Sequence, residues 1–178
     1  GALGVINGDL GSVSMWVQLG VYAHSVAIFS GRVDSENFAW CYYHGGTNQL
    51  RFEHAGGGNE EVLVTTTAVE NNGWHHIACT WDTSENQSAM YVDGSSVDTG
   101  TASSDFEGTF TGIDFGKRRD TAWLQFVGNM NDIAFFDDVL TPEEVEAICN
   151  SGSPKDESSH GGLVGYWKME ENTGTSVA

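Results

Sequence analysis

Residues 73–82 read Gly-Trp-His-His-Ile-Ala-Cys-Thr-Trp-Asp, and residues 90–94 read Met-Tyr-Val-Asp-Gly. In the first run the apolar side chains of Ile77, Cys79 and Trp81 fall at every second position, which is the period of a β-strand with one buried face. Polar residues separate the two runs, and Asp93-Gly94 is a dipeptide typical of hairpin turns with positive φ angles. This stretch therefore predicts a hairpin of two long strands.

Shorter runs with the same alternation lie on both sides of the hairpin. The chain contains 23 glycines and 2 prolines, a balance that suits tight turns with positive φ. Short, evenly spaced strands of this kind predict an all-β sandwich. The candidate strands cover residues 12–19, 25–29, 37–43, 50–53 and 62–66.

One helix is expected, at residues 141–150. Thr141 is a suitable N-cap, Pro142 suits the first turn, and Glu144 stands where a capping box places its acidic residue. Gly152 is expected to end the helix. Residues 153–160 follow with the composition of a linker.

Two blocks of the sequence resemble laminin G-like domains of the concanavalin A-like lectin and glucanase superfamily, which includes the pentraxins. The first block is the central stretch at 73–94. In the second, at 126–145, a glycine, an Asn-Asp pair and an alternating strand precede the helix. The resemblance implies a jelly-roll sandwich of two antiparallel sheets in residues 1–152, with one short helix near the C-terminus.

The last residues, 161–178, resemble the opening strand of such a domain, although they stand at the other end of the chain. We expect this segment to complete the same sheet, because residues 1–10 contain no comparable strand and an unpaired sheet edge is unfavourable. The alternative is that a truncated next repeat begins here.

The net charge of −18 and the pI of about 4.3 disfavour binding to nucleic acid or to an anionic membrane surface. No apolar run is long enough to span a bilayer.

The three cysteines are odd in number and lack C-x-x-C spacing, which favours neither a disulfide framework nor a zinc site. Pentraxins pair the cysteine that matches Cys79, but its partner is absent here, so Cys79 is expected to be a small core residue.

A basic cluster, Lys117-Arg118-Arg119, contains three of the seven basic residues of the chain. Such a cluster creates a local positive potential that can select carboxylates or sulfates. Neutralisation by neighbouring carboxylates is the alternative. Trp123, close by in the sequence, and Arg51, on the opposite strand face from its apolar neighbours, complete the candidate ligand-binding site.

The resemblance also implies a structural calcium ion near the strand termini. Oxygen ligands from Asp120, Asn131 and Asp132 would suit calcium, although arginines stand where pentraxins have further calcium ligands. The alternative is that Asp132 hydrogen-bonds within a turn. His75 and His76 are adjacent on a strand, so they point to opposite faces and cannot chelate one ion together.

Signals for catalysis are weak. The E-x-D-x-x-E strand of the glucanase branch is absent, and the D-x-E at Asp105 and Glu107 lies in an expected loop. We therefore expect a non-catalytic recognition module, extracellular or on a cell or virion surface, that binds carbohydrate in an adhesin or surface protein. The basic cluster points to acidic glycans among its ligands. A structural or protein-interaction module without a glycan ligand is the alternative, and a relative of the glycoside hydrolases is the third.

Overall fold

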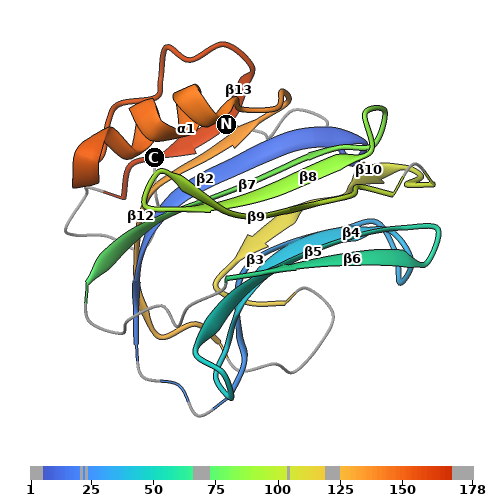
Figure 1. Ribbon diagram of the computed structural model, residues 1–178, viewed down its shortest axis with the longest axis horizontal. Coiled ribbons are helices and arrows are strands. Elements are labelled where there is room, and N and C mark those ends of the chain that lie inside the picture. The colour runs from blue at the N-terminus through green and yellow to red at the C-terminus, as the bar shows by residue number, and fades with distance from the viewer. Residues whose placement is uncertain are drawn as a thin grey trace.

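Two antiparallel β-sheets lie face to face in the computed structural model of the protein (Figure 1), which confirms the predicted all-β sandwich. The structure describes residues 6–20, 22, 24–65, 73–103, 105–118 and 125–169. The five-stranded sheet has the order β11 (Ile113–Phe115), β3 (Val26–Arg32), β4 (Phe38–His44), β5 (Gln49–Gly56), β6 (Asn59–Val64). The six-stranded sheet has the order β13 (Leu163–Trp167), β12 (Gly128–Phe136), β2 (Leu10–Leu19), β7 (Trp74–Asp82), β8 (Gln87–Val92), β9 (Ser95–Gly100). A small sheet pairs β1 (Ile6–Asn7) with β10 (Thr109–Phe110).

The core lies between the two large sheets, and alternate side chains of each strand point into it. Trp81 is fully buried there, and its indole Nε1 donates a hydrogen bond of 2.9 Å to the carbonyl oxygen of Gly8. The rings of Phe52 and Phe135 approach the Trp81 ring from the two opposite sheets. Burial of a side chain of this size contributes on the order of 3 kcal/mol. The hairpin of β7 and β8 therefore supplies the centre of the core, as the alternation at 73–82 predicts.

The cysteines are free thiols inside the protein. Cys79 on β7 is fully buried in the core and contacts Cys41 on β4 of the other sheet. Burial, together with the neighbouring thiol, raises the pKa of the Cys79 thiol well above its ordinary value. Cys79 is thus a small core residue, as expected.

Helix α1 (Pro142–Cys149) covers part of the outer face of the six-stranded sheet (Figure 1). The predicted capping box is present, because the Thr141 hydroxyl accepts from the backbone N–H of Glu144 while the Glu144 carboxylate accepts from that of Thr141. The α-helix ends at Cys149, one residue earlier than expected, where Asn150 adopts a left-handed conformation with φ 44° and forms the C-cap. A 3₁₀ turn, η1 (Asn150–Gly152), follows directly, and the helical segment stops at Gly152 as predicted.

Four short strands were not expected from the sequence: β1, β9, β10 and β11. β9 reads Ser-Ser-Val-Asp-Thr-Gly and lies at the edge of the six-stranded sheet. An edge strand pairs on one side only and can remain polar, so it lacks the alternation that identifies inner strands. The turn that leads from β8 into β9 was predicted from the Asp93-Gly94 dipeptide. These two residues have positive φ values of 51° and 78°.

At the opposite edge, β13 pairs antiparallel with β12. The preceding residues 153–160 lie against this strand. The Tyr166 hydroxyl contacts the carbonyl oxygen of Lys155, Lys168 pairs with Asp156, and only 3% of Glu157 is exposed. None of the helices in the described part of the chain has the length and apolarity needed to cross a membrane.

Candidate functional site

The outer face of the five-stranded sheet carries a pair of stacked aromatic rings. On β4, Ala39, Cys41 and Tyr43 point into the core, so Trp40 and Tyr42 point outward. The two outward rings stack with their centroids 4.2 Å apart and their planes 19° from parallel. Each side chain is only 4% exposed. The pair therefore forms a covered aromatic floor on a face that is otherwise directed away from the core.

Glu53 on the neighbouring strand β5 fixes both rings. Its carboxylate accepts hydrogen bonds from the indole Nε1 of Trp40 and from the Tyr42 hydroxyl, the latter at 2.5 Å. Burial is the main cause that raises the pKa of the Glu53 carboxyl, and nearby Glu60 raises it further. The two hydrogen bonds act in the opposite direction. A buried carboxylate with two donors holds the orientation of the aromatic pair.

Two arginines from separate parts of the chain meet this floor. The Arg118 guanidinium lies 4.2 Å from the centroid of the Trp40 ring, in cation–π geometry. Arg51 is in register with Tyr42 across β4 and β5, so the two side chains project from the same outward face. The Arg51 Nε atom is buried and has no hydrogen-bond partner among the described residues. We call Trp40, Tyr42, Arg51, Glu53 and Arg118 the Arg118 cluster.

Basic residues gather around the Arg118 cluster, although carboxylates such as Glu53 and Asp114 accompany them. Lys117 forms an ion pair of 3.2 Å with Asp114, and Arg32 projects outward at the register position of Phe38. Of the seven basic residues in the chain, Arg32, Arg51, Lys117 and Arg118 thus belong to this face or its adjoining loop. Lys155 and Lys168 lie beside β13 instead.

The structure brings together three of the predicted ligand-binding residues, namely Lys117, Arg118 and Arg51. Arg119, Trp123 and the predicted metal ligand Asp120 lie outside the described residues. Both interpretations of the basic cluster keep support, because a carboxylate pairs with Lys117 while Arg118 stacks on an aromatic ring.

The predicted calcium ligands Asn131 and Asp132 are on the other sheet, in the bulge of β12. Asp132 has a positive φ of 47°, and its Oδ1 accepts a hydrogen bond of 2.5 Å from the Tyr166 hydroxyl. Within the described ranges, no group of three His, Cys, Asp or Glu side chains is arranged to hold a metal ion. These residues alone do not fit a calcium ion, which takes six to eight oxygen ligands. Calcium at Asp120, Asn131 and Asp132 stays a prediction.

The two adjacent histidines point to opposite faces, as expected. His76 is buried and its Nε2 lies 2.8 Å from the Ser14 hydroxyl. His75 instead contacts a carboxylate oxygen of Asp93 through Nδ1, at 2.9 Å. Both imidazoles therefore have partners within the fold.

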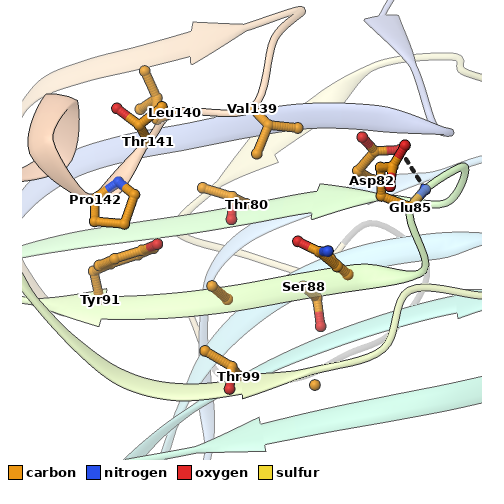
Figure 2. A pocket seen from close by; sticks show the side chains of 13 residues that line it. Thr80, Asp82, Glu85, Ser88, Tyr91, Thr99, Val139, Leu140, Thr141 and Pro142 are labelled. Carbon is orange, nitrogen blue, oxygen red and sulfur yellow. Dashed lines mark hydrogen bonds between the residues drawn. The ribbon is translucent and has the colours of Figure 1, made fainter.

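A groove runs along the outer face of the six-stranded sheet, beside the segment that leads into α1 (Figure 2). It has a volume of about 510 Å³, and Thr80 of β7 and Thr99 of β9 line it from the outer face of the sheet, whereas the Ser88 hydroxyl donates to the carbonyl oxygen of Thr101. Asp82 is engaged in its own turn, where it accepts from the backbone N–H of Glu85. None of the described residues that line this groove is basic. It suits an uncharged ligand better than an anionic one.

The D-x-E of the loop does not form a pair of catalytic carboxylates. Asp105 lines a hollow of about 230 Å³ and accepts a hydrogen bond from Asn59, but Glu107 is not among the lining residues. Phe106, between them, is buried in the core. The two carboxylates of this motif therefore do not face a common cleft.

Sequence reasoning missed Trp40, Tyr42 and Glu53 as partners of the two arginines. The alternation did place Trp40 and Tyr42 in phase with each other. It could not show that this phase faces outward, because aromatic residues more often face the core. The contact between Arg118 and Trp40 joins residues that are far apart in the chain, and no local pattern reports such a contact.

Proteins with the same fold include several carbohydrate-binding domains. The alignment with a putative carbohydrate-binding protein from Bacteroides ovatus covers 99% of this chain and 49% of the Bacteroides chain, with a TM-score of 0.73 and 16% identity. Domain 4 of a GH43 extracellular arabinanase from Geobacillus stearothermophilus was solved with arabinotriose. The alignment covers 84% of this chain and 78% of the arabinanase domain, with a TM-score of 0.66 and 20% identity. A CBM40 domain of the Ruminococcus gnavus IT-sialidase was solved with α2,3-sialyllactose. The alignment covers 79% of this chain and 82% of the CBM40 chain, with a TM-score of 0.63 and 17% identity.

In sequence, the chain is similar to a Rattus norvegicus protein with sushi, von Willebrand factor type A, EGF and pentraxin domains. The identity is 29% over 92 residues, which cover 47% of this chain and only 3% of the rat protein. A family model described as the concanavalin A-like lectin/glucanases superfamily matches residues 4–146. The two-sheet sandwich and this match over most of its length agree, and the chain belongs to the concanavalin A-like lectin/glucanase superfamily.

Proposed function

We propose that this domain is a non-catalytic carbohydrate-binding module and that it binds acidic glycans at the Arg118 cluster. The observation that carries the proposal is the gathering of four of the seven basic residues on one outward sheet face and its adjoining loop, in a protein with a net charge of −18. A positive surface against such a background attracts and orients an anionic ligand selectively.

The structure of the cluster explains how it would bind. Trp40 and Tyr42 are too well covered to stack on a sugar ring, and we assign them the role of a rigid floor. A guanidinium stacked on this floor directs its N–H groups sideways within its own plane, where a carboxylate or sulfate can accept two of them at once. Arg118 and Arg51 are both partly exposed, so a glycan can reach them.

Relatives with the same fold support a carbohydrate ligand. One of them was solved with sialyllactose, whose sialic acid carries a carboxylate, and another with arabinotriose, which is uncharged. Laminin G-like relatives also support an extracellular or surface location, which we include in the proposal.

The test is a glycan array probed with the wild-type protein, Arg118→Ala and Arg51→Ala. We expect binding to carboxylated or sulfated glycans, weakened at least about tenfold by either substitution, because each removes a charge-assisted contact. Lys155→Ala is the matched control, since it removes the same charge from the segment beside β13, away from the Arg118 cluster. Equal weakening by all three variants would show a nonspecific effect of charge and would contradict the assigned site.

The alternative is a structural or protein-interaction module. The groove beside α1 gives such a module a separate contact surface, because it lies on the six-stranded sheet and the Arg118 cluster lies on the five-stranded sheet. Absence of binding to every glycan by a folded protein would support this alternative over the lectin function.

A further inference from the structure

A second outward surface combines an aromatic ring with side-chain amides. It lies at one end of the six-stranded sheet, where Trp74 of β7, Gln18 of β2 and Asn129 of β12 occupy neighbouring register positions across three adjacent strands. Residues of the opposite phase on two of these strands, Val17 and Ile77, belong to the core. The three side chains therefore project from the outer face in one row, which spans about 10 Å at the usual strand spacing.

Trp74 is unusually exposed for a tryptophan. Its side chain is 43% accessible, and among the described residues it is one of three large apolar side chains that are exposed. A second one, Val127, precedes β12 at the same end of this sheet, because Gly128 pairs with Leu19. An indole that is left in water on a rigid strand offers a flat apolar surface to a ligand.

The two amides beside the indole are held in place by each other. Asn129 Nδ2 donates a hydrogen bond of 2.8 Å to Gln18 Oε1. An amide group has two N–H donors and a carbonyl acceptor, so this single bond leaves Asn129 with further hydrogen-bonding capacity. Asn129 itself is exposed, which makes that capacity accessible.

We propose that the row of Trp74, Gln18 and Asn129 is a second carbohydrate subsite, specific for an uncharged pyranose ring. The apolar C–H face of the sugar would stack on the indole, while its hydroxyls would exchange hydrogen bonds with the amides. No member of the row carries a charge, so the subsite does not select acidic sugars. The proposal rests on the carbohydrate-binding function proposed above, but it uses a different sheet from the Arg118 cluster.

The experiment screens neutral oligosaccharides built of pyranose rings, namely hexamers of β-linked glucose, xylose and mannose, by saturation-transfer NMR and by titration. We expect at least one hexamer to bind, and Trp74→Ala to weaken this binding about tenfold or more, because the stacked apolar face is lost. Trp74→Phe should retain most of the affinity, and Asn129→Ala should lose several-fold.

Three controls separate this proposal from the previous one. Val62→Ala truncates an exposed apolar side chain on the other sheet and should leave neutral-sugar binding unchanged, as should Arg118→Ala. Thermal melting verifies that Trp74→Ala is folded. Binding of no neutral hexamer, or binding that persists undiminished in Trp74→Ala, overturns the second subsite. In either case binding of acidic glycans through Arg118 would leave the proposed function intact.

Discussion

His76 is completely buried on the outer side of β7, beside Ser14 and in ring contact with Trp16. Burial lowers the pKa of its imidazole to about 4, and the charge of Asp93 opposes this shift only in part. The folded protein therefore keeps His76 neutral at a pH where the unfolded chain takes up a proton. The stability that this group contributes is present above its ordinary pKa of 6.5 and is lost as the pH falls toward 4.

His76→Gln should reduce this sensitivity to acid. We expect the loss of unfolding free energy between pH 7 and pH 5 to be smaller in the variant by about 2 kcal/mol, because the glutamine has no proton to bind. Urea unfolding at the two pH values measures it. His24→Gln, at an exposed position, is the control and should leave the difference unchanged. If the loss of unfolding free energy between pH 7 and pH 5 is the same in His76→Gln as in the wild type, the folded protein does not hold the imidazole neutral.

At the scale of elements, α1 depends on the cap at its N-terminus. Thr141 and Glu144 satisfy each other's backbone N–H groups there. Thr141→Ala should lower the unfolding free energy by about 1 kcal/mol. Thr109→Ala, at an exposed position of β10, is the matched control and should have a smaller effect. If denaturant unfolding shows equal losses for the two variants, the cap does not contribute as described.

The bulge of β12 also depends on a side-chain hydrogen bond, which Asp132 accepts from Tyr166. Asp132→Asn keeps a residue type that tolerates the positive φ, but it weakens the hydrogen bond from Tyr166. We expect a loss of about 1 kcal/mol that is the same in calcium as in EDTA, because the bond that weakens comes from the Tyr166 hydroxyl. A loss of stability that occurs only in calcium would instead make Asp132 a metal ligand.

Elements with two independent local signals could be predicted from the sequence. The strand at 73–82 has both alternation and a following turn, and α1 has both a cap and an apolar stripe. β9 has neither signal beyond its turn. The Arg118 cluster was predictable only in part, because the charge of Arg118 is visible in the sequence whereas its aromatic floor depends on which face of β4 turns outward.

At the scale of the whole molecule, the net charge of −18 acts in opposite directions on folding and on binding. Repulsion among the acidic residues destabilises the compact state, and salt screens it. We therefore expect the melting temperature to rise with sodium chloride, while the affinity for acidic glycans falls. Calorimetry measures the melting temperature and glycan titration measures the affinity over the same series of salt concentrations. A melting temperature that falls with salt would show that attractive pairs dominate.

The order of the six-stranded sheet has a consequence for synthesis of the chain. β2, near the start of the sequence, lies between β7 and β12, and its register with β12 joins Ser12 to Phe136. On the ribosome, β2 thus remains without its second neighbour until almost the whole domain has emerged. A nascent chain that stalls before residue 128 exposes a ten-residue strand edge rich in apolar side chains, which is a surface that chaperones bind and that aggregates recruit. The closing pairing of β12 on β2 makes folding of this domain a late and slow event with high contact order.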